Sequence, residues 1–301
     1  MTSLKYFRDH NNGDIEVIVS DNASSDETRE RVTQFIRQNK LDNFTYERNE
    51  INIGPDANFK KALSMATGVY AFLLGDDDFL NDPFLQDLLE QLRALERPVS
   101  FLTVLAPRGK AGEGKLDLFS IENMRDYLVT IGPQITFMSS MVFNTEAVQR
   151  VLRQELKYEP NLFQSFLQVA AIRSASDAPF GVFYAHAFSF NGEPTATNYS
   201  FYEVFVTRVV SLYRTALPDS SEVEVRCAYK EAFMHYLMKF TILLKALGQN
   251  PKFEKSAYEI LRHFPVSWCV LMPLFLVPGW IYRPMYRVYK GIKDARRREK
   301  N

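Results

Sequence analysis

The sequence contains little cysteine and no excess of charge of either sign. Its two cysteines, Cys227 and Cys269, are far apart, and neither belongs to a CxxC or Cys/His cluster. This pattern argues against a disulfide scaffold and against a zinc site, and it fits a reducing compartment. The 36 basic residues balance the 36 acidic residues, so the overall charge gives no sign of nucleic-acid binding.

The first residues also lack the apolar core of a secretory signal, because residues 1–14 are mostly polar. We therefore expect a cytoplasmic protein. What the sequence has in quantity is apolar residues, 46% of its 301. That is enough for one large core or two modest ones, and it favours a single catalytic domain with an appendage.

In the first half of the chain, short apolar runs alternate with helical patterns. We expect strands at 15–20, 44–47, 69–74 and 99–105, and helices at 26–39, 58–67 and 83–95. Strands that alternate with helices are typical of an α/β fold with a mostly parallel sheet. Further along, the pattern predicts strands at 135–143 and 181–186, helices at 145–156 and 162–172, and a helical region at 202–264.

The last part of the chain differs in kind. Residues 264–282 carry almost no charge but are interrupted by three prolines and a glycine, and a spanning helix needs about 20 apolar residues. Residues 283–301 then carry eight Lys or Arg against Asp294 and Glu299. An apolar segment before a basic amphipathic tail predicts attachment to an anionic cytoplasmic membrane face. The alternative is a terminal helix packed on the domain, with a solvated tail.

Three consecutive carboxylates follow the predicted strand at 69–74, in the loop Gly75-Asp76-Asp77-Asp78. Adjacent like charges raise one another's pKa unless something positive binds among them. Mg²⁺ and Mn²⁺ prefer oxygen ligands and also hold phosphate oxygens. The acidic loop therefore predicts a metal-diphosphate site. The alternative is a solvated loop in which Asp78 or Asn81 caps the next helix.

Two polar turns follow the earlier predicted strands. The first strand ends at Asp21 and leads into a turn in which Ser24 and Glu27 have the spacing of a capping box. A capping box would explain those two residues but not Asp21, and ligands of open α/β sheets bind at such strand ends. The second turn runs from Arg48 to Asn58 and is an ordinary loop on turn chemistry alone.

Taken together, VIVSDNASSDET, NIGPDANFKKALSMATGVYAFLLGDDD and their order resemble the family-2 glycosyltransferases of the GT-A fold, especially the O-antigen and abequosyl-type branch. The resemblance implies a nucleoside-diphosphate sugar donor, Mn²⁺ or Mg²⁺, and a glycan acceptor, which the apolar C-terminal segment suggests is polyprenyl-linked. We expect a donor-binding half at 1–105, an acceptor-binding half at 106–200, a helical region at 201–263, and the apolar segment with its basic tail at 264–301.

The resemblance also implies roles for single residues. Asp77 matches the metal ligand, with Asp78 supporting it, and Gly75 stands where the family usually has aspartate. Asp76 would lie near the ribose or diphosphate. The expected donor-binding residues are Asp21, which would contact the base or ribose, together with Asn22, Ser24, Arg48 and Asn58.

For catalysis, inverting relatives use an acceptor-side carboxylate as general base. Family position indicates Glu159, in the stretch Tyr158-Glu159-Pro160-Asn161 before a predicted helix. The alternative is that Glu159 caps that helix. Asp177, His186 and Glu193 are further candidates.

The resemblance starts inside a helix near Leu4 to Asp9, whereas family members begin with a strand. We therefore keep, as an alternative, a non-catalytic glycosyltransferase-like binding protein at the membrane. A nucleotidyltransferase ranks third, because no glycine-rich phosphate loop precedes residue 15.

Overall fold

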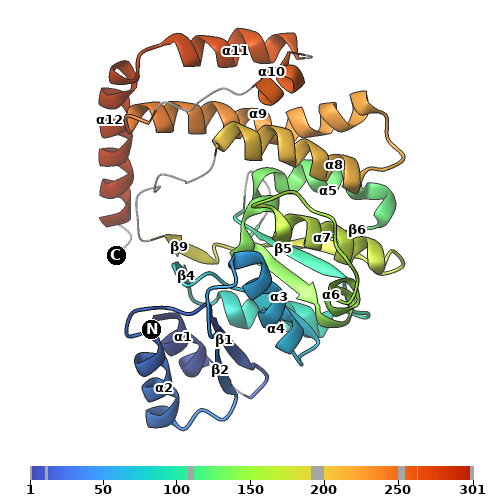
Figure 1. The fold of residues 1–301 in the computed structure, drawn as a ribbon, viewed down its shortest axis with the longest axis vertical. Helices are drawn as coiled ribbons and strands as arrows, with labels where there is room; N and C mark the ends of the chain where they lie inside the picture. The colour runs from blue at the N-terminus through green and yellow to red at the C-terminus, as the bar shows by residue number, and fades with distance from the viewer. Residues whose placement is uncertain are drawn as a thin grey trace. The chain divides into compact units, whose positions relative to one another are not determined.

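A computed structural model describes residues 2–10, 13–107, 112–190, 200–249, 255–262 and 264–298 of the chain. The chain divides into two compact units, Met1–Gly192 and Glu193–Asn301 (Figure 1). The first unit is α/β and the second is helical. The predicted halves 1–105 and 106–200 share one sheet in the first unit, since β5 pairs with strands from beyond residue 106.

The main sheet of the first unit has five strands in the order β3 (Tyr70–Leu73), β7 (Met141–Asn144), β5 (Phe101–Leu105), β8 (Phe180–Tyr184) and β6 (Leu116–Phe119). Only β5 and β8 run parallel. The pairs β3–β7, β5–β7 and β6–β8 are antiparallel. The expected mostly parallel sheet is therefore wrong: the sheet is mixed, because β7 returns in the opposite direction between β3 and β5.

The centre of this sheet is apolar on both faces. Every residue of β5 and of β8 is buried, as expected for strands covered on both sides. Gly181 allows β6 to approach β8, because a Cβ atom at this position would lie 2.5 Å from the Asp117 carbonyl oxygen. Phe101 and Phe143 pack edge to face across neighbouring strands, with ring centroids 4.9 Å apart.

Two smaller sheets complete the unit. Strands β1 (Val17–Asp21) and β2 (Phe44–Arg48) form a parallel pair, joined by helix α2 (Thr28–Asn39). This pair packs with α1 (Thr2–His10) around a small apolar cluster of Leu4, Val17, Val32, Phe35 and Phe44. Strands β4 (Asp78–Leu80) and β9 (Phe188–Phe190) form an antiparallel ribbon. The Glu16 carboxylate accepts the N–H groups of Thr67 and Gly68, which ties the start of β1 to the loop before β3.

The remaining helices of the first unit are α3 (Pro55–Met65), α4 (Phe84–Ala94), α5 (Met124–Ile131), α6 (Thr145–Leu152) and α7 (Phe163–Ser174). Short 3₁₀ turns span Ile121–Asn123, Gly132–Thr136 and Met138–Ser140. The strand predicted at 135–143 is thus mostly 3₁₀ turn, and only its end belongs to β7. Buried Ile135 and Ser139 explain the error, since they face the core from turns.

The second unit consists of helices only, in the part of it that is described. A π-helical turn at Glu203–Arg208 leads into α8 (Val209–Ala216), followed by α9 (Glu222–Ala246), α10 (Lys255–Leu261), α11 (Pro265–Leu276) and α12 (Gly279–Arg298). A capping box of Ser221 and Glu224 starts α9. Its inner face buries Tyr229, Phe233 and Leu237. In the described residues, none of the helices has the length and apolar character needed to cross a membrane.

Candidate functional site

The carboxyl ends of β1 and β2 place Asp21 beside Arg48. The two strands are parallel and in register, so these residues are direct partners. The Asp21 carboxylate accepts the Tyr46 hydroxyl and the Ser24 N–H, the latter at 2.8 Å, and the Arg48 guanidinium lies 3.5 Å away. The Asp21 side chain is only 1% exposed. In this arrangement Asp21 faces inward and holds Arg48 and the turn at Ser24.

These contacts define the charge state of Asp21. Burial alone would raise the pKa of the carboxyl, but hydrogen bonds from Tyr46 and Ser24 and the charge of Arg48 lower it below its ordinary value. Burial and the Asp21 carboxylate, to which the Tyr46 hydroxyl donates, raise the pKa of Tyr46 to about 12. Asp21 is therefore an anion and Tyr46 a neutral donor at neutral pH.

Asn22 connects the first turn to the second. Its side-chain oxygen accepts the Asn49 side-chain amide at 3.1 Å and the Ile53 N–H at 2.9 Å. Its own amide donates to the Asn52 side-chain oxygen at 2.9 Å. These bonds fix the loop between β2 and α3 against the end of β1.

Asn58, in the first turn of α3, extends the same network. Its oxygen accepts the Ser20 hydroxyl at 2.8 Å and the Asn49 amide at 3.0 Å, and its amide donates to the Ser20 carbonyl at 3.1 Å. The Lys61 ammonium donates to the Asn49 side-chain oxygen at 2.9 Å. Asn49 is buried, and Lys61 brings a positive charge to it.

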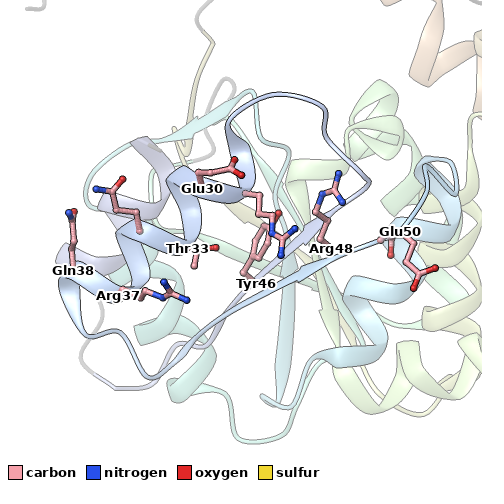
Figure 2. A pocket seen from close by; sticks show the side chains of 10 residues that line it. Glu30, Thr33, Arg37, Gln38, Tyr46, Arg48 and Glu50 are labelled. Atoms are coloured by element: carbon pink, nitrogen blue, oxygen red, sulfur yellow. The ribbon is translucent and has the colours of Figure 1, made fainter.

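A groove of about 820 Å³ opens beside this network, between α2 and β2. Figure 2 shows Arg37 and Gln38 toward one end and Arg48 and Glu50 toward the other, with Thr33 and Tyr46 between. Arg48 belongs both to the groove and to the network. The groove is thus a polar surface next to the strand ends.

The acidic loop follows β3 and is held from a distant part of the chain. Asp76 and Asp77 are exposed, whereas Asp78 is 8% exposed and begins β4. The Ser139 hydroxyl donates to the Asp78 carboxylate at 2.5 Å and accepts the Gly75 N–H at 2.8 Å. Neither Asp78 nor Asn81 caps α4, whose N-cap is Pro83, so the helix-cap alternative is wrong.

Three oxygen atoms converge on the space above Gly75. A Cβ atom at this position would lie 3.0 Å from Asp77 Oδ1, 3.2 Å from Asp78 Oδ2 and 3.3 Å from Ser139 Oγ. Burial, and then the charges of Asp77 and Asp76, raise the pKa of Asp78, against the hydrogen bond from Ser139. A cation among these oxygens would relieve the repulsion.

The donor set suits a hard divalent ion that is not wholly enclosed by protein. Within the described ranges, no three His, Cys, Asp or Glu side chains cluster closely enough to hold a metal. Mg²⁺ commonly binds through one or two carboxylates and completes its coordination with water and substrate phosphates. Asp77 and Asp78, with Ser139 nearby, fit that mode of binding.

The other predicted positions are arranged as follows. The Ser24–Glu27 capping box does not form: α2 begins at Thr28, whose N–H and hydroxyl both bond to the Asp26 carboxylate. Ser24 instead accepts the Arg48 guanidinium at its carbonyl, at 3.1 Å. Arg48, at the end of β2, therefore holds the turn between β1 and α2 at Ser24.

Glu159 lies in the connection between α6 and α7 and is half-buried. Its neighbour Tyr158 hydrogen-bonds the Asp56 carboxylate in the first turn of α3, which brings this connection close to the start of α3. Helix α7 starts at Phe163 without a side-chain cap, so Glu159 does not cap it. Glu159 as general base stays a prediction.

Of the further candidates, Asp177 and His186 belong to the described residues. Asp177 is exposed in a turn before β8. His186 is 70% exposed and lies 3.9 Å from the Glu113 carboxylate. Glu193 lies outside the described residues.

Sequence reasoning missed Tyr46, Asn49, Lys61 and Ser139. Tyr46 and Asn49 flank Arg48 in the chain, and Lys61 is one turn beyond Asn58. Their positions in the sequence, next to predicted site residues, were the only sign that they belong to the site. Ser139 carried none, because its partner Asp78 is 61 residues away.

One family model and several curated proteins match parts of the chain. The model of the family described as "Glycosyl transferase family 2" matches residues 2–166. The abequosyltransferase RfbV of Salmonella typhimurium is 45% identical over 69 residues, 23% of this chain and 20% of that protein. The uncharacterized protein Rv1520 of Mycobacterium tuberculosis is 38% identical over 84 residues, 28% of this chain and 23% of that protein. The chain thus spans about a fifth of the length of these curated relatives.

A solved structure shares the fold over most of the chain. S. aureus TarS 1-349, in complex with UDP-GlcNAc, superimposes with a TM-score of 0.55 at 18% sequence identity. The match covers 88% of this chain and 76% of that one. At this identity the likeness concerns the fold.

Proposed function

This chain belongs to glycosyl transferase family 2, and we propose that it transfers a sugar from a nucleoside-diphosphate donor to a glycan hydroxyl, with the help of Mn²⁺ or Mg²⁺. The observation that carries the proposal is the convergence of Asp77, Asp78 and Ser139 oxygens above Gly75. This point directly follows β3, in the segment that the family match covers.

In the proposed site, Asp77 and Asp78 would hold the metal ion, and Ser139 would fix the position of Asp78 through its hydrogen bond. The bound ion would supply neutralisation of the charge that develops on the diphosphate as the bond to the sugar breaks. Asp76, exposed at the start of the loop, would face the ribose or diphosphate. Gly75 leaves the space that the ion needs.

The strand-end network would bind the nucleoside part of the donor. Arg48 lines the groove and would contact the donor there, while Asn58 would hold the buried Asn49 beside it. Asn22 and Ser24 would set the two turns next to the groove. Asp21 fixes Arg48 through its buried carboxylate. In this role Asp21 acts mainly by positioning Arg48. To contact the donor itself, the Asp21 carboxylate would have to give up one of its present hydrogen bonds, from Tyr46 or from Ser24.

We propose Glu159 as general base for an inverting reaction. Its carboxylate takes the proton of the acceptor hydroxyl while that oxygen attacks the anomeric carbon on the face opposite the diphosphate. The bond between the anomeric carbon and the diphosphate oxygen breaks, and the nucleoside diphosphate leaves. The contact between Tyr158 and Asp56 supports a position beside the donor loop.

The acceptor that we propose is a glycan carried on a polyprenyl diphosphate, in cell-surface polysaccharide synthesis. The similarity to an abequosyltransferase over 69 residues supports transfer of a sugar, and the apolar segment at 264–282 with its basic tail supports the lipid carrier. Parallel assays with a lipid-linked glycan and with the same glycan released from its lipid would test it. Equal rates on both would contradict the lipid-linked acceptor and leave the transfer reaction standing.

The metal role is tested by hydrolysis of a panel of nucleoside-diphosphate sugars with Mn²⁺, comparing the native chain with Asp77→Ala. We expect a loss of about 100-fold or more, on the scale of removing a charge-stabilising group. The exposed Asp42→Ala serves as control. An unchanged rate in Asp77→Ala would remove Asp77 from the metal site. Metal-dependent donor binding without turnover in the native chain would instead favour the binding-protein alternative.

A further inference from the structure

The elbow between α11 and α12 is fixed onto α9. Lys245 is 5% exposed, and its ammonium donates to the carbonyls of Leu274, at 3.0 Å, and of Phe275, the last turn of α11. Gly279, at the start of α12, abuts the Lys245 carbonyl, because a Cβ atom there would lie 2.5 Å from that oxygen. Tyr282 is 7% exposed on the same side. The direction of α12 is therefore set by packing.

This packing leaves a set of large apolar side chains on the outside. We name Leu276, Trp280, Ile281 and Val288 the apolar stripe; they are 77%, 68%, 40% and 63% exposed. Ile281 and Val288 are seven residues apart on α12, two helical turns, and so lie on the same face, whereas Tyr282 is buried and donates to the Leu274 carbonyl of α11 at 3.5 Å. Single exposed apolar residues are ordinary, but four large ones between residues 276 and 288 indicate an interaction surface.

Positive charge accompanies the stripe. Arg283 and Arg287 lie between its members and are exposed. From residue 283 onward the sequence holds eight Lys or Arg and only two acidic residues, Asp294 and Glu299. The stripe, with Trp280 near its start and arginines beside it, complements the surface of an anionic lipid bilayer. Such a surface carries negative headgroups, and its apolar acyl chains lie just beneath them.

The structure also limits how much of the apolar segment is available. Helix α11 is 12 residues long, too short to span a bilayer that needs about 20. Its Leu271 is 2% exposed and Phe264, just before it, is 7% exposed, so both belong to the core of the second unit. The apolar segment predicted at 264–282 is thus partly core, and its exposed large side chains, Leu276, Trp280 and Ile281, belong to the stripe.

We propose that the apolar stripe docks on an anionic lipid bilayer, with α12 lying along the membrane surface and its arginines at the headgroups. Trp280 and Val288 would enter the boundary between headgroups and acyl chains. A helix of 20 residues is about 30 Å long, so α12 offers several contacts at once. The surface lies wholly in the second unit and does not depend on the glycosyl-transfer reaction.

The first test is co-sedimentation of the full chain with vesicles. Vesicles of phosphatidylcholine alone are compared with vesicles that also contain phosphatidylglycerol. We expect binding to the anionic vesicles that weakens as salt is raised, and a roughly tenfold loss for Trp280→Glu. The control Val223→Glu alters an apolar residue that is 71% exposed at the start of α9, and it should bind like the native chain.

Charge is tested separately with Arg283→Gln combined with Arg287→Gln. We expect a loss of about tenfold or more on anionic vesicles, since each arginine near such a surface contributes roughly fivefold. The control pair, Arg97→Gln with Arg153→Gln, removes two exposed arginines of the first unit. Circular dichroism confirms that each variant is folded.

Three results would overturn the proposal. The first is equal binding to both kinds of vesicle, and the second is native binding by Trp280→Glu. The third is concentration-dependent self-association that Trp280→Glu abolishes while vesicle binding is absent, which would assign the stripe to a second copy of the chain. Sedimentation velocity without lipid measures this last outcome.

Discussion

Ser139 donates its hydroxyl hydrogen bond to the Asp78 carboxylate from a position 61 residues further along the chain. The same hydroxyl accepts the N–H of Gly75. One fully buried side chain thus fixes both ends of the acidic loop. The geometry of the proposed metal site consequently depends on the 3₁₀ turns before β7 as much as on the loop itself.

Replacing Ser139 with alanine should weaken metal binding. Ser139→Ala leaves the Gly75 N–H and a buried carboxylate without their partner, which costs about 1–3 kcal/mol of unfolding free energy. We expect Mn²⁺ affinity, measured by isothermal titration calorimetry, to fall by about 10- to 100-fold. Ser140→Ala is the matched control, since Ser140 is equally buried but bonds only backbone carbonyls. A similar loss of affinity in the control would contradict a specific role for Ser139.

A methyl group at position 75 should interfere directly with the ion. In Gly75→Ala the new carbon would lie 3.0 Å from Asp77 Oδ1, closer than ordinary contact, so the carboxylate must move. We expect about tenfold weaker Mn²⁺ binding with little change in thermal stability. Gly112→Ala provides the comparison, because a Cβ atom there meets nothing within 4 Å. Native affinity in Gly75→Ala would show that the ion binds elsewhere.

Much of the first unit could be predicted from the sequence, because its signals are local. The buried runs that became β1, β3 and β5, and the helices between them, lie within a few residues of their predicted bounds. Strand direction is not local: β7 inserts between β3 and β5 through pairings such as Tyr70 with Asn144. Nothing in the alternation of apolar residues records which neighbour a strand takes, so the mixed sheet was missed.

The candidate site divides in the same way. Carboxylates after a buried strand, as at Asp77, are visible in a single stretch of sequence. The amide network around Asn49 needs three segments brought together, and the Ser139 contact needs two distant ones. The capping box at Ser24 does not form, because Asp21 holds the Ser24 N–H, Arg48 holds its carbonyl, and α2 begins only at Thr28.

Asp21 should make the stability of the protein depend on pH in the acid range. Its folded-state pKa is lowered from the ordinary 3.8, so its stabilising contribution is complete above that value and is lost as the pH falls through the lower, folded value. Asp21→Asn should lower the free energy of unfolding by about 2 kcal/mol at pH 7.

Urea unfolding at several pH values measures this difference. The gap between the native chain and Asp21→Asn should be constant from about pH 5 to 8 and shrink below about pH 4. The exposed Asp42→Asn should change the unfolding free energy by less than about 0.5 kcal/mol. A gap that widens on acidification would contradict the lowered pKa.

Glu159→Gln should reduce turnover without weakening donor binding. Loss of a general base typically lowers the rate by about 10²- to 10⁴-fold. Single-turnover kinetics with a labelled donor separate the chemical step from binding. Glu155→Gln, an exposed acid four residues earlier, is expected to act at the native rate. If the two variants turned over at equal rates, Glu159 would not be the general base, and another carboxylate would have that role.

The separation of β1–β2 from the five-stranded sheet gives the first unit two levels of protection against amide exchange. In the described chain this pair has no further strand partner, and α3 together with the contacts of Glu16 connects it to the rest. Strand β5 is hydrogen-bonded on both sides. Amides at 17–21 and 44–48 should therefore exchange through local opening, well before those at 101–105. A nucleotide that bridges the ends of β1 and β2 would slow amide exchange at 17–21 and 44–48 toward that at 101–105. Part of its binding free energy would then be used to suppress the local opening of this strand pair.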